Sequence, residues 1–283
     1  MRKPYGGVSR ITKRPVKALL AIHDWDSFHQ YLIVDALTTY ANARTQAGLG
    51  LGSVLAVGAN AHEASEFGAF PFESIVLAGI DDPDAATSAI IAEDPRFGYR
   101  HENGECMDLP SGTFDLTFCK EAAHHFARPV AGFYELLRLS RYAVVLIEPY
   151  DTAVGRLFER LGMASVSEVL QAEDEVTRDS IQLRCMNLGR NSNYVYRWNR
   201  RQLEMLLSSY YVDSGWSLDL KIGWMTGRLN CDSRAFVRAA ATIAGRFASW
   251  WPWSPGNYMT AFIQIGRDLP PDMACLARNM SDS

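Results

Sequence analysis

The stretch that decides the fold runs from residue 107 to residue 119 and reads Met107-Asp-Leu-Pro-Ser-Gly-Thr-Phe-Asp-Leu-Thr-Phe-Cys119. Its first half has the composition of a turn. Its second half, which begins at Phe114, is a short apolar run typical of a buried strand in a parallel sheet. Further short apolar runs occupy residues 53–58, 74–80, 97–102 and 143–147. Helical patterns lie around them at residues 24–48, 61–68, 84–92 and 129–140. This alternation predicts right-handed βαβ units and a parallel sheet with helices on both faces.

The pattern becomes looser after residue 151. Residues 151–195 look helical and polar, with no obvious strand. The remaining segments are a helix at 199–209, a strand at 216–224, a helix at 234–248 and a strand at 258–265. These strands would extend the sheet on one side.

Composition excludes several classes of protein. The chain has 283 residues, of which 48% are hydrophobic and 21% charged, as in an ordinary soluble globular protein. A net charge of −4 argues against a dedicated nucleic-acid binder. No apolar run reaches the roughly 20 residues of a membrane helix, and no secretory signal pattern begins the chain. Five scattered cysteines without a CxxC pair indicate reduced thiols and no zinc site. We therefore expect a cytoplasmic protein without a membrane or nucleic-acid partner.

Residues 1–23 form a basic N-terminal arm. Six cations precede the first acid of the chain: Arg2, Lys3, Arg10, Lys13, Arg14 and Lys17. One interpretation is a solvated, partly disordered arm, as is usual for chain termini. The other is an arm that folds over an anionic substrate, such as a nucleotide-linked sugar or a phosphate.

Ligands of such sheets bind outside the carboxyl ends of the strands. Five groups of residues follow predicted strands: 58–62, 81–82, 104–108, 119–125 and 148–151. The candidate site residues are therefore sought in these groups.

The segment from Val54 to Pro149 resembles the class I S-adenosylmethionine-dependent methyltransferases, in particular the small-molecule (type 11-like) group. The resemblance is carried by the stretch quoted above, by Glu121-Ala-Ala-His-His-Phe126 and by Glu135-Leu-Leu-Arg138, in family order and spacing over about a third of the chain. It implies a Rossmann-like α/β fold, a seven-stranded, mostly parallel sheet with an antiparallel last strand, helices on both faces and helical lid insertions. It also implies one methyltransferase domain over 24–283, with a cofactor-binding core at 54–150 and lid or acceptor insertions at 151–195 and 225–256.

The resemblance implies S-adenosyl-L-methionine as cofactor. Gly58 matches the first glycine of the family's glycine motif, which lets the backbone approach the methionine part of the cofactor. Ala56 stands where the family has an acid, and Asn60 and His62 stand where it has two further glycines. Since asparagine tolerates a left-handed backbone, we expect Asn60 to keep the geometry of the turn.

Other cofactor contacts are implied further along. Asp81, with Asp82 beside it, matches the acid that binds both ribose hydroxyls, although these residues could simply cap a helix. Glu105 and Cys106 match the adenine contacts, although Asp108 to Gly112 could be no more than a turn. Cys119, at the end of the next strand, completes the predicted cofactor set.

Four residues are candidates for catalysis. His124 and His125 lie just past a strand end, where an imidazole could remove a proton from a hydroxyl or amine acceptor. Glu148 and Asp151 end the next strand and are alternative bases or groups that orient the acceptor. The alternative for the histidines is a packing role. No ligand spacing supports a metal site.

The sequence therefore predicts methyl transfer to an oxygen or nitrogen of a small molecule, with a sugar or natural product as the preferred acceptor. Two alternatives stay open. The first is a methyltransferase fold that has lost methyl transfer and acts as a partner protein or catalyses another reaction. The second is a nucleotide-binding dehydrogenase. The identity of the acceptor and the oligomeric state are not predicted, because the expected acceptor insertions contain no motif.

Overall fold

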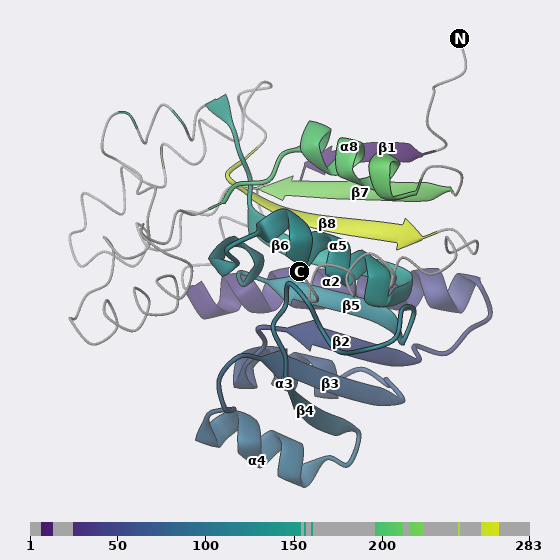
Figure 1. Cartoon of the computed structure of the whole chain (residues 1–283), viewed down its shortest axis with the longest axis vertical. Helices are drawn as coiled ribbons and strands as arrows, with labels where there is room; N and C mark the ends of the chain where they lie inside the picture. Colours follow the sequence, from purple (N-terminus) through teal and green to yellow (C-terminus); the bar gives the residue numbers. More distant parts are fainter. Residues whose placement is uncertain are drawn as a thin grey trace, which may run out of the picture.

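The computed structural model describes residues 7–13, 25–153, 156, 160, 196–211, 215–223, 243 and 256–265. The strands are β1 (Val8–Lys13), β2 (Ser53–Val57), β3 (Ser74–Gly79), β4 (Phe97–His101), β5 (Phe114–Lys120), β6 (Ser140–Pro149), β7 (Trp216–Gly223) and β8 (Tyr258–Ile265). They form one sheet in the order β1-β7-β8-β6-β5-β2-β3-β4 (Figure 1). The helices are α2 (Trp25–Gln46), α3 (Ala61–Gly68), α4 (Ala85–Glu93), the 3-10 turn η1 (Ala123–His125), α5 (Pro129–Leu139) and α8 (Arg200–Tyr210).

The direction of the strands confirms the predicted fold class. Strands β2 to β6 pair in parallel with one another. Strand β8 runs antiparallel to both of its neighbours, β6 and β7. The mostly parallel sheet with an antiparallel last strand is therefore as expected, but it has eight strands and not seven.

The additional strand is β1, which lies in the segment expected to be an arm. It pairs in parallel with β7, with Val8 opposite Ser217 and Lys13 opposite Ile222. The Arg10 guanidinium lies 3.3 Å from the Asp219 carboxylate on that neighbour. Neither interpretation of the arm included pairing with the sheet, because the partner strand lies about two hundred residues further along the chain.

Helices cover both faces of the sheet. Alternate residues of β2 point to opposite sides, as in any strand. Leu55 and Val57 belong to the core cluster that includes residues of α5 and α8, whereas Val54 and Ala56 belong to the cluster with α2 and α3. In Figure 1, α5 and α8 lie in front of the sheet and α2 lies behind it. A strand buried on both faces must be apolar throughout, which is why these strands were visible as continuous apolar runs.

The expected lid segments, 151–195 and 225–256, and the helix expected at 234–248 lie almost entirely outside the described residues. In the part of the chain that the structure describes, no helix is both long enough and apolar enough to cross a bilayer.

Candidate active site

The strand order brings the predicted site residues to one edge of the sheet. Strands β4, β3, β2, β5 and β6 are neighbours and point in the same direction, so their carboxyl ends lie side by side. Gly58 follows β2, and Asp81 follows β3. Cys119 and Glu148 lie at the ends of β5 and β6, and His124 follows β5. Four of the five groups of residues taken from the sequence are therefore neighbours at this edge of the sheet.

The turn after β2 requires glycine. Gly58 has φ +70°, and a Cβ built on it would lie 2.3 Å from the Ala122 Cβ. A side chain at this position would therefore be strained and would collide with the loop after β5. The backbone of Gly58 forms part of a cavity wall, which is the close approach that a bound cofactor of the expected kind needs.

The expectation that Asn60 keeps a left-handed turn is wrong. Its backbone is extended, with φ −123°, and it serves as the N-cap of α3. The Asn60 side chain accepts from the His62 amide at 2.8 Å, while its own amide donates to Glu63 Oε2 at 2.9 Å. This is a capping box, a local arrangement that competes with the left-handed turn and satisfies helix-end amides.

A cavity of about 240 Å³ opens at this edge of the sheet. It is lined by Gly58, Asn60, Glu63, Lys120, Glu121, His124 and His125. Four of these residues were predicted from the sequence. The other three, Glu63, Lys120 and Glu121, were not predicted, because an isolated Glu or Lys in a sequence is usually exposed.

These three charges form a compact cluster in the cavity wall. Lys120 Nζ lies 2.8 Å from Glu63 Oε1 and 3.4 Å from Glu121 Oε2. The side chains of Lys120 and Glu63 are only 8% and 3% exposed. Burial would lower the pKa of the Lys120 ammonium, but the two carboxylates outweigh it and raise that pKa. The ammonium is therefore charged at neutral pH.

Glu121 joins this cluster to two distant elements. Its carboxylate lies 3.0 Å from His29 Nε2 on α2, and the Tyr258 hydroxyl on β8 helps to lower the pKa of Glu121. Burial opposes ionisation, but His29 and Lys120 hold the pKa of Glu121 at about 2. Its φ of +50° makes Glu121 the only non-glycine residue with positive φ among the described residues.

This low pKa predicts how stability depends on pH. Because the pKa falls from 4.5 to about 2 on folding, the stabilisation from Glu121 is present above pH 4.5 and is lost as the pH falls toward 2. We expect Glu121→Gln to lower the free energy of unfolding at pH 7 by about 1–3 kcal/mol. Urea unfolding at pH 7, 4.5 and 3 should show the difference from wild type shrinking with acidity. A difference that stays constant across this range would contradict the assignment.

His124 and Glu148 form a buried pair beside the cluster. His124 Nδ1 lies 2.6 Å from Glu148 Oε2, and the other carboxylate oxygen accepts from the Ala123 amide at 2.9 Å. Glu148 is fully buried, and burial raises its pKa despite the opposing effect of the His124 imidazole. A carboxyl group in this position fixes the orientation of the His124 ring. The rings of His124 and His125 have centroids 4.3 Å apart.

No protein-family model and no curated protein matches the chain. Among solved structures it is similar to the YcgJ protein from Bacillus subtilis, with 15% identity, a TM-score of 0.46 and coverage of 76% of this chain and 92% of that one. It is also similar to a putative methyltransferase from Bacillus halodurans, with 14% identity, a TM-score of 0.42 and coverage of 75% of this chain and 90% of that one. A third similar structure is the magnesium protoporphyrin IX methyltransferase from Synechocystis, with 11% identity, a TM-score of 0.47 and coverage of 84% of this chain and 83% of that one. These likenesses are too distant to carry an argument about activity.

The order and direction of the strands decide the fold. Five parallel strands and an antiparallel last strand are the arrangement that the sequence resemblance implied, and the structure adds that this strand, β8, lies between β6 and β7. The fold is that of the class I methyltransferases. The remaining predicted residues can be placed on this methyltransferase fold.

Asp81 and Asp82 lie at the end of β3 and are exposed. The Tyr99 hydroxyl donates to the Asp81 backbone carbonyl, and Asp82 Oδ1 lies 2.9 Å from His101 Nε2. Neither caps α4, because that role belongs to Asp84, which accepts from the Thr87 amide at 2.7 Å. The structure thus removes the helix-cap alternative, and the ribose contact stays a prediction.

The residues predicted to contact adenine are engaged within the protein. Glu105 accepts from the Arg128 amide at 3.0 Å and from its Nε at 2.7 Å. The Cys106 amide donates to the Asn103 carbonyl at 2.9 Å. Cys119 is fully buried in the core and does not line the cavity, and burial raises the pKa of its thiol. Cofactor contacts by these residues stay predictions.

Asp151 stands apart from the cavity. Its carboxylate lies 2.5 Å from an Arg156 nitrogen, and its amide donates to the Trp198 carbonyl at 2.8 Å. It does not line the cavity. Among the described residues, no group of three or more His, Cys, Asp or Glu side chains could hold a metal ion.

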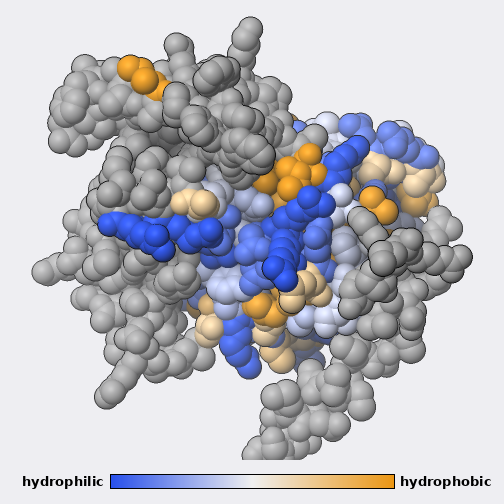
Figure 2. Space-filling model, turned by 90° about the horizontal axis from the view of Figure 1, so that it is seen from above, coloured by the Kyte–Doolittle hydropathy of each residue, from blue (hydrophilic) through white to orange (hydrophobic). Residues whose placement is uncertain are grey.

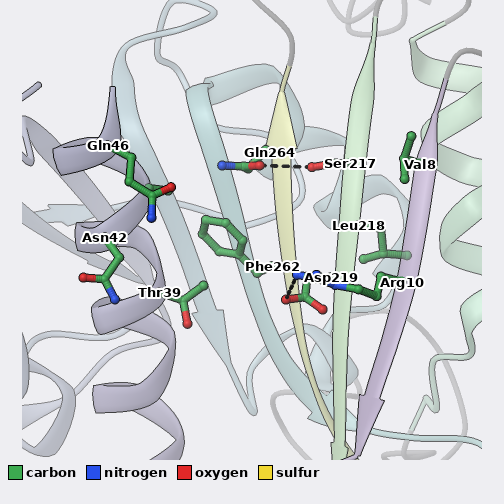
Figure 3. Close-up of a pocket in the computed structure, with 11 residues that line it drawn as sticks. Val8, Arg10, Thr39, Asn42, Gln46, Ser217, Leu218, Asp219, Phe262 and Gln264 are labelled. Carbon is green, nitrogen blue, oxygen red and sulfur yellow. Dashed lines mark hydrogen bonds and ion pairs between the residues drawn. The ribbon is translucent and has the colours of Figure 1, made fainter. Parts of the chain in front are cut away.

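A second hollow, of about 470 Å³, lies between α2 and the strands β1, β7 and β8 and shares no lining residue with the first cavity (Figure 3). Within it, Ser217 hydrogen-bonds to Gln264 and Arg10 pairs with Asp219. None of the predicted site residues lines it. Seen from above, the described surface is mostly hydrophilic with smaller hydrophobic areas (Figure 2). The candidate active site is therefore the cavity at the carboxyl edge of the sheet.

Proposed function

We propose that this chain transfers the methyl group of S-adenosyl-L-methionine to an oxygen or nitrogen of a small molecule, with a sugar or natural product as the acceptor class. The observation that carries the proposal is the cavity at Gly58. There, a turn that excludes any side chain faces an imidazole held by a buried carboxylate.

The proposed site residues have two roles, which are binding of the cofactor and transfer of a proton from the acceptor. The backbone at Gly58 would lie against the methionine part of the cofactor, and Asp81 would accept from the ribose hydroxyls. His124 would take the proton of the acceptor hydroxyl or amine on Nε2, while Glu148 holds Nδ1. The bound cofactor supplies an activated methyl group on a sulfonium, so positioning provides much of the rate.

Calorimetric titration with S-adenosylmethionine and S-adenosylhomocysteine tests the cofactor. We expect micromolar binding of both by the wild type. Asp81→Ala should weaken both about 10- to 100-fold, because each charged hydrogen bond to a ribose hydroxyl is then lost. The matched control is Asp84→Asn, which removes a nearby charge but keeps a side chain that can cap α4.

Unchanged affinity in Asp81→Ala would remove the ribose role of this residue. Absence of binding at millimolar ligand, by protein with an intact cooperative unfolding transition, would overturn the proposal. It would favour the alternative, a methyltransferase fold that no longer transfers methyl groups. The departures at Ala56, Asn60 and His62 are the features that support this alternative.

A further inference from the structure

The charge cluster of Glu63, Lys120 and Glu121 is more than the fold requires. A buried ion pair seldom stabilises a protein more than apolar side chains of the same shape would. Here one ammonium and two carboxylates lie in the wall of a cavity, two of them nearly fully buried. Such a cluster presents positive and negative groups to the same small space.

The hydrogen bonds leave part of this cluster available. Glu63 is committed on both oxygens, to Lys120 and to the Asn60 amide. The Lys120 ammonium has three N–H donors, and in the described part of the chain two carboxylates lie close to it. One donor is therefore left for an anion in the cavity.

The backbone conformation of Glu121 is a second observation that favours a ligand site here. A non-glycine residue in the left-handed region is strained, and such residues cluster at functional sites. This conformation places a carboxylate next to Lys120 in the cavity wall. The contacts of the Glu121 carboxylate with His29 and Lys120 are both made by Oε2, and a carboxylate has about four acceptor sites on its two oxygens. The site thus combines a cation that can hold a carboxylate with an anion that can accept from an ammonium.

An α-amino acid group has these two charges on neighbouring atoms. We propose that Lys120 and Glu121 bind the carboxylate and the ammonium of the amino-acid end of the cofactor, while Glu63 positions Lys120. The inference rests on the proposed function and deepens it. It assigns the role to residues outside the glycine motif, in a chain where position 56 is a buried alanine packed on the α2 side of the sheet.

Two ligands separate this role from a structural one. S-adenosylhomocysteine has the amino-acid end, whereas 5′-methylthioadenosine has the same nucleoside and thioether without it. We expect Lys120→Met to weaken S-adenosylhomocysteine binding about 10- to 100-fold and to leave methylthioadenosine binding within about twofold, as measured by calorimetry. Glu121→Gln should show the same selectivity.

Two further variants act as controls. Lys221→Met removes a lysine that is paired with Asp35 on α2 at 3.1 Å and does not line the cavity, so both affinities should stay unchanged. If Lys120→Met fails to fold, the double variant Glu63→Gln/Lys120→Met removes both charges of the buried pair and leaves no unpaired ion between them. It should show the same selective loss.

The outcomes distinguish the inference from the proposed function. Equal loss for both ligands in the Lys120 variants would mean a merely structural cluster, and no loss for either would remove Lys120 from the site. Both results would overturn the inference and leave the cofactor assignment standing. A wild-type protein that binds neither ligand would overturn both.

Discussion

Replacing His124 by glutamine is expected to lower the rate of methyl transfer by about 10²- to 10⁴-fold, the usual contribution of a positioned general base. The expectation follows from the 2.6 Å contact between His124 Nδ1 and Glu148, which holds the ring in the cavity wall. The affinity for S-adenosylmethionine should stay within about threefold, because the substitution removes a proton acceptor and no cofactor contact that we propose.

The measurement follows release of S-adenosylhomocysteine with whichever acceptor the wild type methylates fastest in a panel of sugars, phenols and amines. His125→Gln is the matched control, because this neighbouring histidine also lines the cavity but is exposed, whereas His124 is buried. Glu148→Gln should cause a fall of comparable size, since an amide that donates to Nδ1 would place the ring proton on Nε2 and leave no basic nitrogen for the acceptor. A larger effect at His125 than at His124 would reverse the assignment.

Replacing Arg138 by methionine is expected to cost about 3–5 kcal/mol of stability, the typical loss when one partner of a buried ion pair is removed. Arg138 donates to both oxygens of Glu135, at 2.8 and 2.6 Å. It also donates to the carbonyls of Met107 and Leu109, at 3.1 and 2.6 Å. Both side chains are nearly buried, so Glu135 would lose the cation that balances its charge.

Urea unfolding at pH 7 measures this loss. Arg141→Met is the control, because Arg141 is half exposed and donates to the carbonyls of Gly112 and Thr113 near the surface. It should cost less than about 1 kcal/mol, as is usual for exposed polar contacts. A loss below about 1 kcal/mol for Arg138→Met would contradict the prediction. It would show that the bonds from Arg138 to Glu135 and to the loop between β4 and β5 add little to the free energy of unfolding.

The Glu135–Arg138 pair also explains why the family resemblance is informative in this part of the chain. Glu135 and Arg138 lie on one face of α5 because residues three apart are neighbours on a helix. Together they hold the backbone of residues 107–109, since the Met107 amide also donates to Glu135 Oε1 at 2.7 Å. The spacing that was read as a family motif is thus a device that holds the loop before β5.

The sequence by itself determined the sheet and the region of the site. A strand of a parallel sheet is buried on both faces, so it must be a short apolar run, and polar residues resume where it ends. This constraint is local, and for that reason β2, β3, β5 and β8 were predicted to within about a residue. Strand β1 gave no such signal, because an edge strand that mixes charged, polar and apolar residues resembles an exposed arm.

Only the tertiary structure decided which polar groups gather around the site. His29, Glu63, Lys120 and Tyr258 come from four elements, and nothing in the local pattern of any of them indicates the others. The same holds for Asn60, whose residue type permits a left-handed turn but whose side chain is used to cap α3. Burial and pairing of charges depend on contacts between segments distant in sequence, and these contacts exist only after the sheet has brought its strand ends together.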